Sequence, residues 1–296
     1  MYERLLVPLD GSTSAQMVLP YVVEIAARHN SEIMLVSVSE SKATDVDFLY
    51  RSYLEHTSEE MRSKLDYYGA KKVKVHDHVL LGRPADEILR YAEDSDASLI
   101  IMASRGATSH GPWLLGNIAA KVLWAAKRPV LLIKSPARGE AIERKSVLQR
   151  ILLPLDGSRI GEAAIPAAEA LARPLAAQLV LFQALEPVYQ VSAVPELNNP
   201  LIVLPVDEKM KAAARAYLDG VGKLLRNRGL AVTIIIEEGQ PAERILDYAK
   251  SNAIDLIAMS THGRSGIGRW VFGSVTDKVL HAGDTAVLVV RATQPG

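Results

Sequence analysis

Short, wholly apolar runs alternate along this chain with longer stretches in which apolar residues recur at every third or fourth position. Runs of the first kind are typical of strands buried on both faces of a sheet. Stretches of the second kind are typical of helices with one apolar face. This alternation predicts a parallel sheet with helices on both faces in each half of the chain. The predicted strands begin near residues 4, 33, 73, 99 and 129 and, in the second half, near residues 150, 179, 232, 256 and 286.

The second half of the chain repeats the first. Both first strands run into Pro-Leu-Asp-Gly-Ser, and their aspartates, Asp10 and Asp156, are 146 positions apart (156 − 10). Later in the repeat the spacing is 157 positions, as between Gly106 and Gly263 (263 − 106), so the second half holds 11 additional residues (157 − 146). They fall in the proline-containing stretch 187–206, which we interpret as a wandering loop; a lid or contact surface is the alternative.

The helical stretches have their own signals. Helices are predicted over 13–29 and 159–173, and Pro20 and Pro166 lie at equivalent places within them. Two later helices are expected to carry Pro84 and Pro241 in their first turn. A long helix over 46–68 is expected to turn one apolar stripe toward the sheet. Its members are Val46, Leu49, Tyr50, Tyr53, Leu54, Met61, Leu65 and Tyr68.

These elements predict an α/β protein of two tandem doubly wound domains. A chain of 296 residues suggests about two domains. We place them at 1–138 and 149–296, joined by the polar linker 139–148. Each is expected to hold a five-stranded parallel sheet in the order 3-2-1-4-5, with helices on both faces. Such sheets bind ligands outside the carboxyl ends of the strands, where the strand order reverses.

A glycine-containing loop follows the fourth strand in each half, at that switch point. In the second half it runs from Ser260 through Gly263 to Gly273 and Ser274, where a helix begins. Glycine admits close backbone approach, serine is a favoured N-cap, and a helix N-terminus attracts phosphate. An ordinary strand–helix loop is the alternative. The same loop pattern recurs in the first half, at Gly106 and Gly116, and this repetition favours a phosphate site.

The aspartates after the first strands are expected to share the crevice with these loops. A carboxylate accepts hydrogen bonds from a ribose hydroxyl or an adenine amino group. Asp-Gly is also a common turn pair, which is the alternative interpretation. At the end of each second strand, the backbone of Val38 or Ala184 is placed to contact the edge of an adenine base.

Other chemistries are disfavoured. The glycine loops lack the Lys-Ser/Thr of a P-loop, and no Gly-x-Gly-x-x-Gly follows the first strands. His76 and His78 share a strand face, but without a third ligand we interpret them as solvated rather than metal-binding. His262 and Arg105 flank the key glycines and are candidates for phosphate contact, or simply exposed loop residues.

The composition limits the partners and the cellular location that we expect. The formal net charge is +0, which argues against nucleic acid as a partner, and the chain has no cysteine. The N-terminus resembles a strand rather than a signal peptide. No apolar run approaches the length of about 18 residues that suggests a membrane-spanning helix. A cytoplasmic location is the expectation.

The chain resembles a tandem universal stress protein over nearly its whole length. The nucleotide-binding branch of that family has Gly-x2-Gly-x9-Gly-Ser/Thr after the fourth strand. The second half matches it from Ser260 to Ser274, with serine for the first glycine. The first half matches from Ala103 to Asn117, with alanine for the first glycine and asparagine for Ser/Thr. The resemblance implies ATP, or ADP or AMP, in the second domain, with Mg²⁺ bound through the phosphates.

The same resemblance implies the partners and the residues of the site. Members commonly pair through their fifth strands, so the two domains are expected to pair within the chain, with a homodimer and an unidentified protein partner left open. The residues predicted for the second site are Pro154, Leu155, Asp156, Ala184, Met259, Ser260, His262, Gly263, Arg264, Gly273, Ser274, Val275 and Thr276. Those predicted for the first are Asp10, Val38, Met102, Ala103, Arg105, Gly106, Gly116 and Asn117.

The resulting hypothesis is an ATP-binding stress-response regulator that is not an enzyme. A slow ATP hydrolase or phosphotransferase is one alternative, disfavoured because no lysine clamp or general base is evident. A protein-interaction module that binds no nucleotide is the other. The first site, with Asn117 in place of a hydroxyl residue, is expected to be weaker or empty.

Overall fold

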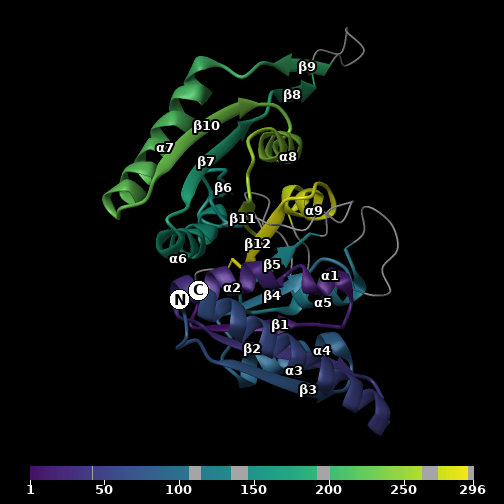
Figure 1. Cartoon of the computed structure of the whole chain (residues 1–296). Coiled ribbons are helices and arrows are strands. Elements are labelled where there is room, and N and C mark those ends of the chain that lie inside the picture. The colour runs from purple at the N-terminus through teal and green to yellow at the C-terminus, as the bar shows by residue number, and fades with distance from the viewer. Residues whose placement is uncertain (42, 107–114, 135–145, 192–200, 262–272, 293–296) are drawn as a thin grey trace.

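The computed structural model of the chain describes residues 1–41, 43–106, 115–134, 146–191, 201–261 and 273–292. Its centre is one sheet of ten strands that runs through both halves of the molecule, with helices on its two faces (Figure 1). The order of the strands is β10-β7-β6-β11-β12-β5-β4-β1-β2-β3. Each half of the sheet therefore has the predicted order 3-2-1-4-5.

The strands of the first half are β1 (Arg4–Pro8), β2 (Glu32–Ser39), β3 (Val75–Leu81), β4 (Leu99–Ala103) and β5 (Val130–Ile133). Those of the second half are β6 (Arg150–Pro154), β7 (Gln178–Leu185), β10 (Val232–Glu238), β11 (Leu256–Ser260) and β12 (Ala286–Val290). Within each half every pair of neighbours is parallel. Where the halves meet, β12 and β5 are antiparallel, with Leu288 opposite Leu131. The fifth strands thus pair inside the chain, as predicted.

The helices cover both faces of the sheet. Those of the first half are α1 (Thr13–Gln16), α2 (Leu19–His29), α3 (Thr44–Tyr67), α4 (Pro84–Asp94) and α5 (Asn117–Ala125). Those of the second half are the 3-10 turn η1 (Gly161–Ala164), α6 (Ile165–Leu175), α7 (Glu208–Asn227), α8 (Pro241–Ser251) and α9 (Ser274–His281). Pro84 and Pro241 lie in the first turn of α4 and α8, as predicted.

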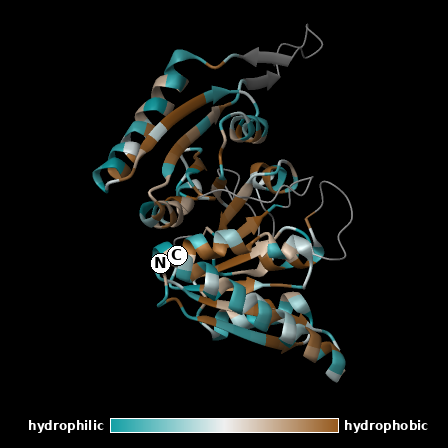
Figure 2. Ribbon diagram, viewed as in Figure 1, coloured by the Kyte–Doolittle hydropathy of each residue, from teal (hydrophilic) through white to brown (hydrophobic). Residues whose placement is uncertain are grey.

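Burial of the central strands explains their apolar composition. β4, β5 and β11 are buried at every position, because helices cover them on both sides. Apolar residues accordingly concentrate in the sheet, while the helices carry hydrophilic residues on their outer surfaces (Figure 2). The two apolar layers, one on each face of the sheet, both run through the two halves of the molecule.

The halves also contact each other away from the sheet. The buried hydroxyl of Tyr2 donates a hydrogen bond of 2.9 Å to the carbonyl of Ala167, in α6. The backbone N–H of Val147, just before β6, donates to the carboxylate of Glu24, in α2, at 2.6 Å. Burial raises the pKa of Tyr2 above its ordinary value of 10.0, so this donor stays neutral even at a pH at which an exposed tyrosine ionises.

Two predicted helices are each divided in the structure. The stretch 13–29 forms α1 and then α2, and 159–173 forms η1 and then α6. Pro20 and Pro166 lie in the first turn of the second member of each pair. Proline has no N–H to donate and is best accommodated in the first turn of a helix, which explains why a new helix begins at Pro20 and at Pro166.

Two further differences concern α3 and the additional residues. In α3 three residues of the predicted stripe are buried, Leu54, Met61 and Leu65. Leu49 is 66% exposed, and Tyr68, which follows the last residue of the helix, is 44% exposed. The stretch 187–206 is not simply a loop. It contains two short antiparallel strands, β8 (Val188–Val191) and β9 (Leu201–Leu204), which project from the second half (Figure 1).

No helix in the described part of the chain is long and apolar enough to cross a membrane.

Candidate functional site

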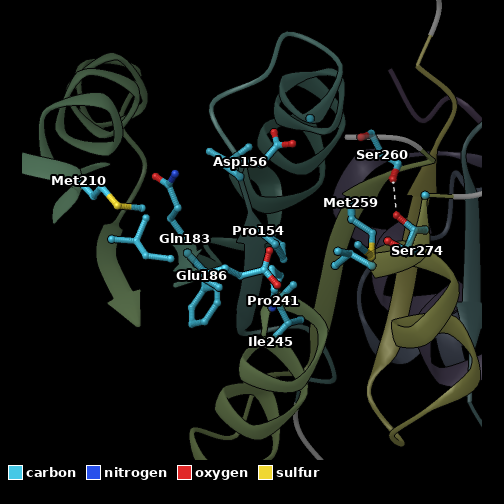
Figure 3. Close-up of a pocket in the computed structure, with 18 of the residues that line it drawn as sticks. Pro154, Asp156, Gln183, Glu186, Met210, Pro241, Ile245, Met259, Ser260 and Ser274 are labelled. Carbon is cyan, nitrogen blue, oxygen red and sulfur yellow. Dashed lines mark hydrogen bonds between the residues drawn. The ribbon is translucent and has the colours of Figure 1, made fainter. Parts of the chain in front are cut away.

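A pocket of about 550 Å³ lies at the carboxyl ends of β7, β6 and β11, where the strand order of the second half reverses (Figure 3). The predicted residues that line it are Pro154, Leu155, Asp156, Ala184, Met259, Ser260, Gly273, Ser274, Val275 and Thr276. The structure thus brings the aspartate, the end of the second strand and the start of α9 to one cavity. His262, Gly263 and Arg264, also predicted, lie outside the described residues.

Asp156 forms the turn that follows β6. Its Oδ1 accepts hydrogen bonds from the backbone N–H of Ser158 at 2.9 Å and from the Ser158 hydroxyl at 2.7 Å. Gly157 adopts φ +79°, a conformation that strongly favours glycine. A Cβ on Gly161 would come within 2.5 Å of Asp156 Oδ1, so the η1 backbone packs directly on the carboxylate. Asp156 is therefore both a turn residue and part of the pocket wall.

Helix α9 presents its N-terminus to the pocket. Gly273, not Ser274, is the N-cap, and Ser274 is the first helical residue, so the predicted serine cap is wrong by one position. The Gly273 N–H donates to the carbonyl of Thr261 at 2.8 Å, which turns the chain into the helix. The N–H groups of Ser274, Val275 and Thr276 precede the first intrahelical hydrogen bond, so the helix provides no acceptor for them. They form the anion-attracting end of α9.

Thr276 joins this helix to the neighbouring strand. Its hydroxyl is buried and donates to the carbonyl of Ser260, the last residue of β11, at 2.9 Å (Figure 3). The bond satisfies a carbonyl at the strand end and fixes the first turn of α9 relative to β11.

The remaining walls come from residues that the sequence analysis missed. They are Gly161, Phe182, Gln183, Leu185, Glu186, Pro187, Met210, Pro241 and Ile245. Most are apolar, so the pocket has a polar end at Asp156 and α9 and an apolar part near β7 and α8. Gln183 and Leu185 adjoin Ala184, and Phe182 lies two residues before it, so proximity to a predicted residue was the available signal for these three. Met210, on α7, carried none.

The equivalent residues of the first half lie at the corresponding ends of β1, β2 and β4. A Cβ on Gly106 would come within 2.3 Å of Asp10 Oδ2, so the start of the glycine loop packs against this aspartate. Asp10 Oδ1 also accepts from the N–H and hydroxyl of Ser12, at 3.0 and 2.6 Å. Met102 and Ala103 are buried at the end of β4, and Val38 and Arg105 are partly buried. The predicted pair of aspartate and loop is therefore brought together here as well.

The start of α5 also repeats the start of α9. Gly116 is the N-cap, its N–H donates to the carbonyl of Ser104 at 2.8 Å, and Asn117 is the first helical residue. Asn117, like Ser274, is therefore not the N-cap of its helix. Several positions differ in kind: Ala119 corresponds to Thr276 (276 − 157), Asn117 to Ser274 (274 − 157) and Ser37 to Gln183 (183 − 146). The first half thus lacks the threonine hydroxyl that anchors α9.

The two strand histidines do not assemble a metal site. His76 Nε2 lies 2.8 Å from a carboxylate oxygen of Glu32 on the neighbouring strand, and His78 packs against Tyr91. No group of three or more potential metal ligands occurs among the described residues.

The fold and the pocket define a tandem doubly wound α/β protein with a ligand-sized cavity at a switch point of its sheet. The profile of the Universal stress protein family matches residues 1–134 and 148–291, and the chain belongs to that family. A universal stress protein of Synechocystis is 25% identical over 316 residues, covering 98% of this chain and 100% of its own. One from Methanocaldococcus jannaschii is 27% identical over 148 residues, covering 47% of this chain and 85% of its own.

A solved structure agrees with the fold. The crystal structure of a universal stress protein from Archaeoglobus fulgidus matches with a TM-score of 0.71 at 22% identity, covering 99% of this chain and 100% of that one. The tandem arrangement of two domains is therefore found in a solved member of the family.

Proposed function

We propose that the second half of this chain binds an adenine nucleotide, with ATP as the first candidate, and acts as a nucleotide-dependent regulator of the stress response. The observation that carries the proposal is the pocket, which combines a helix N-terminus, a carboxylate and an apolar wall in one cavity. Membership of the universal stress protein family and the glycine pattern from Ser260 to Ser274 support the same ligand.

Each end of the pocket suits a different part of a nucleotide. The phosphates would accept hydrogen bonds from the N–H groups at the start of α9 and lie at the positive end of its dipole. Asp156 would accept a hydrogen bond from the ribose. The base would pack among Phe182, Pro241 and Ile245, near the backbone of Ala184. Mg²⁺ would be held through the phosphates, which are its usual ligands in nucleotide sites.

We infer that the site holds the nucleotide without cleaving it rapidly. Asp156 and Glu186 are the charged side chains among the described residues that line the pocket, and no lysine, arginine or histidine is among them. Phosphoryl transfer depends on positioned cations that neutralise charge in the transition state. A slow ATP hydrolase remains the alternative. Phosphate release at about 1 s⁻¹ or faster, the low end of ordinary enzyme turnover, would favour it.

Gly273→Val tests the binding site. Gly273 has φ −59° and ψ 147°, which valine adopts without strain, so the fold should survive while the side chain occupies space beside the helix N-terminus. Calorimetric affinity for ATP should fall more than tenfold, or more than about 1.4 kcal/mol. Gly116→Val is the matched control, since Gly116 has nearly the same backbone angles, φ −61° and ψ 148°, at the first site.

An unchanged ATP affinity in a folded Gly273→Val protein would contradict this assignment. An ultraviolet spectrum of the denatured protein distinguishes a nucleotide-binding protein from the remaining alternative, an interaction module that binds no nucleotide. Nucleotide that co-purifies would appear as absorbance characteristic of a base, and the Gly273→Val protein should lose it.

A further inference from the structure

Glu186 brings an exposed carboxylate to the wall of the pocket. It follows Leu185, the last residue of β7, and lines the cavity together with Ala184. Its carboxylate makes no hydrogen bond or ion pair with another residue in the described parts of the chain. An ionised carboxylate accepts hydrogen bonds and donates none. Glu186 therefore offers a bound ligand an acceptor that the ligand can reach.

The side chain of Glu186 lies on the side of the pocket where the base would pack. Phe182 and Ala184 point to the face of β7 that α8 covers, in one apolar layer with residues of that helix. Leu185 points to the opposite face and packs with residues of α7. Because side chains alternate between the faces of a strand, Glu186 continues the row of Phe182 and Ala184. Figure 3 shows its side chain directed toward Pro241, the first residue of α8, and away from α7.

The order of the strands indicates which edge of the base Glu186 meets. The strands β7, β6 and β11 are neighbours in that order. The phosphates would lie at α9, which follows β11, and the ribose at Asp156, which follows β6. The end of β7 is one strand farther on, about 4.8 Å beyond the ribose position. A purine is joined to its ribose through N9, so the edge with positions 1, 2 and 6 faces away from the sugar. In adenine the hydrogen-bond donor on that edge is the 6-amino group.

We propose that the Glu186 carboxylate accepts a hydrogen bond from the 6-amino group of the bound adenine and thereby favours this base over a purine without that group. The proposal rests on the proposed function and deepens it, because it assigns the recognition of the base to a side chain. The first half carries a carboxylate at the same position, since Glu40 corresponds to Glu186 (186 − 146) and is exposed as well. Glu40 therefore provides a matched control.

The test is a cycle that changes the protein and the ligand separately. The affinities of ATP and of purine riboside triphosphate, which has hydrogen in place of the 6-amino group, are measured by calorimetry on the full chain. The unaltered protein should prefer ATP about three- to tenfold, the worth of one hydrogen bond. In Glu186→Met, which removes the acceptor and keeps the length of the side chain, this preference should fall to about one. Glu186→Gln keeps a neutral acceptor and should retain a preference of about twofold or more.

The ratio of the two affinities separates the acceptor from the charge of Glu186. Both variants remove the same negative charge and so change the attraction for either triphosphate equally, whereas only Glu186→Met removes the acceptor. Because the side chain is exposed, both variants should fold. Glu40→Met is the matched control in the first half, and it should leave the preference for ATP unchanged.

The same preference for ATP in Glu186→Met and in the unaltered protein would overturn the proposal while leaving nucleotide binding intact. If that variant instead only lowers the thermal midpoint, Glu186 serves the N-terminus of α8, where a carboxylate is favoured, and not the base. Tighter binding of GTP than of ATP, lost in Glu186→Met, would place the carboxylate at the N1–H of guanine and would overturn the assignment to adenine. If the unaltered protein binds no nucleotide at all, the proposed function fails first, and this inference with it.

Discussion

At the scale of single residues, one threonine hydroxyl fixes the position of the phosphate-facing helix. Thr276 is 4% exposed and donates to the carbonyl of Ser260 at 2.9 Å. Valine has nearly the same shape but cannot donate, so Thr276→Val would leave the Ser260 carbonyl without this bond. The free energy of unfolding should fall by about 1–3 kcal/mol, and ATP affinity should fall as well because α9 is less well positioned.

Thr57→Val is the control for this prediction. Thr57, in α3, is 2% exposed and donates to the carbonyl of Tyr53 at 2.8 Å, far along the chain from the pocket. It should lower stability in urea denaturation without changing ATP affinity. Equal losses of affinity in both variants would mean that general destabilisation, not the position of α9, explains the effect.

The residues of the pocket differ in how far sequence could predict them. Asp156 and Gly273 occupy special backbone positions at strand and helix ends, and repetition in register made them visible. Gln183 and Met210 lie on separate elements, and nothing in their local sequence marks them; only the packing of α7 beside β7 brings both to one cavity. Side-chain contacts between distant segments depend on tertiary packing, which periodicity does not encode.

At the scale of elements, helix α9 is held at both ends. Its C-terminus is capped by Lys134, which follows β5 in the other half. The Lys134 ammonium donates to the carbonyls of Val279 at 2.8 Å, Ala282 at 3.0 Å and Gly283 at 3.3 Å. A cation at a helix C-terminus is stabilised by the helix dipole. The first half of the chain thereby contacts the helix whose other end faces the pocket.

This lysine should make stability depend on pH. Burial lowers the pKa of Lys134 to about 8, with nearby Arg105 acting in the same direction and Asp284 opposing it. The unfolded chain, with a pKa near 10.5, binds more protons between these two values. Burial thus outweighs the stabilisation of the charge by the helix C-terminus. The free energy of unfolding should therefore rise with pH from about 8 to about 10.5 through this group.

Lys134→Met removes this titrating group and so measures its contribution to the pH dependence of stability. Between pH 8 and pH 10 the stability of the unaltered protein should increase relative to that of the variant by about 1–2 kcal/mol. Urea denaturation of both proteins at several pH values measures this difference. A difference that stays constant, or shrinks as the pH rises, would contradict the shifted pKa.

Elements with a strong local hydrophobic pattern could be predicted from the sequence. The breaks within two helices and the short strands of the additional segment could not. The apolar runs predicted the ten strands of the main sheet, because a strand buried on both faces is apolar at nearly every position. The breaks before α2 and α6 were missed because apolar spacing continues across Pro20 and Pro166. The strands β8 and β9 were missed because the prolines of 187–206 suggested irregular structure.

At the scale of the whole molecule, the two halves behave as partners joined by a linker. The antiparallel pair of β12 and β5, the bond from Tyr2 to Ala167 and the cap provided by Lys134 are all noncovalent. Together they close the sheet edges that β5 and β12 would otherwise expose. The residues that lead into β6 add to this interface, since the backbone N–H of Val147 donates to Glu24 of α2. We expect the connection through residues 135–145 to act by raising the local concentration of each half.

Cutting the linker should leave the halves associated. With a protease site introduced at residue 140, the nicked protein should elute in size-exclusion chromatography as one species of unchanged size. Replacing Leu131 and Leu288, which face each other across β5 and β12, by lysine should separate the fragments, because buried like charges would meet in the sheet. Separation of the nicked but otherwise unaltered protein would contradict the pairing.

The last prediction concerns the number of nucleotides bound by one chain. The halves share a fold, but Thr276 and Gln183 in the second correspond to Ala119 and Ser37 in the first. The first half therefore lacks the hydroxyl that anchors the phosphate-facing helix. Ser274 likewise offers a hydroxyl where Asn117 offers an amide.

We accordingly expect one tight site per chain. Calorimetric titration with ATP should give a stoichiometry near one, and Gly116→Val should leave both stoichiometry and affinity unchanged, while Gly273→Val should remove the tight binding. Restoring the missing hydroxyl with Ala119→Thr should strengthen binding at the first half if this residue accounts for the difference. Two equivalent sites in the unaltered protein would show that the aspartate and glycine loop alone suffice, and that the substituted positions do not control affinity.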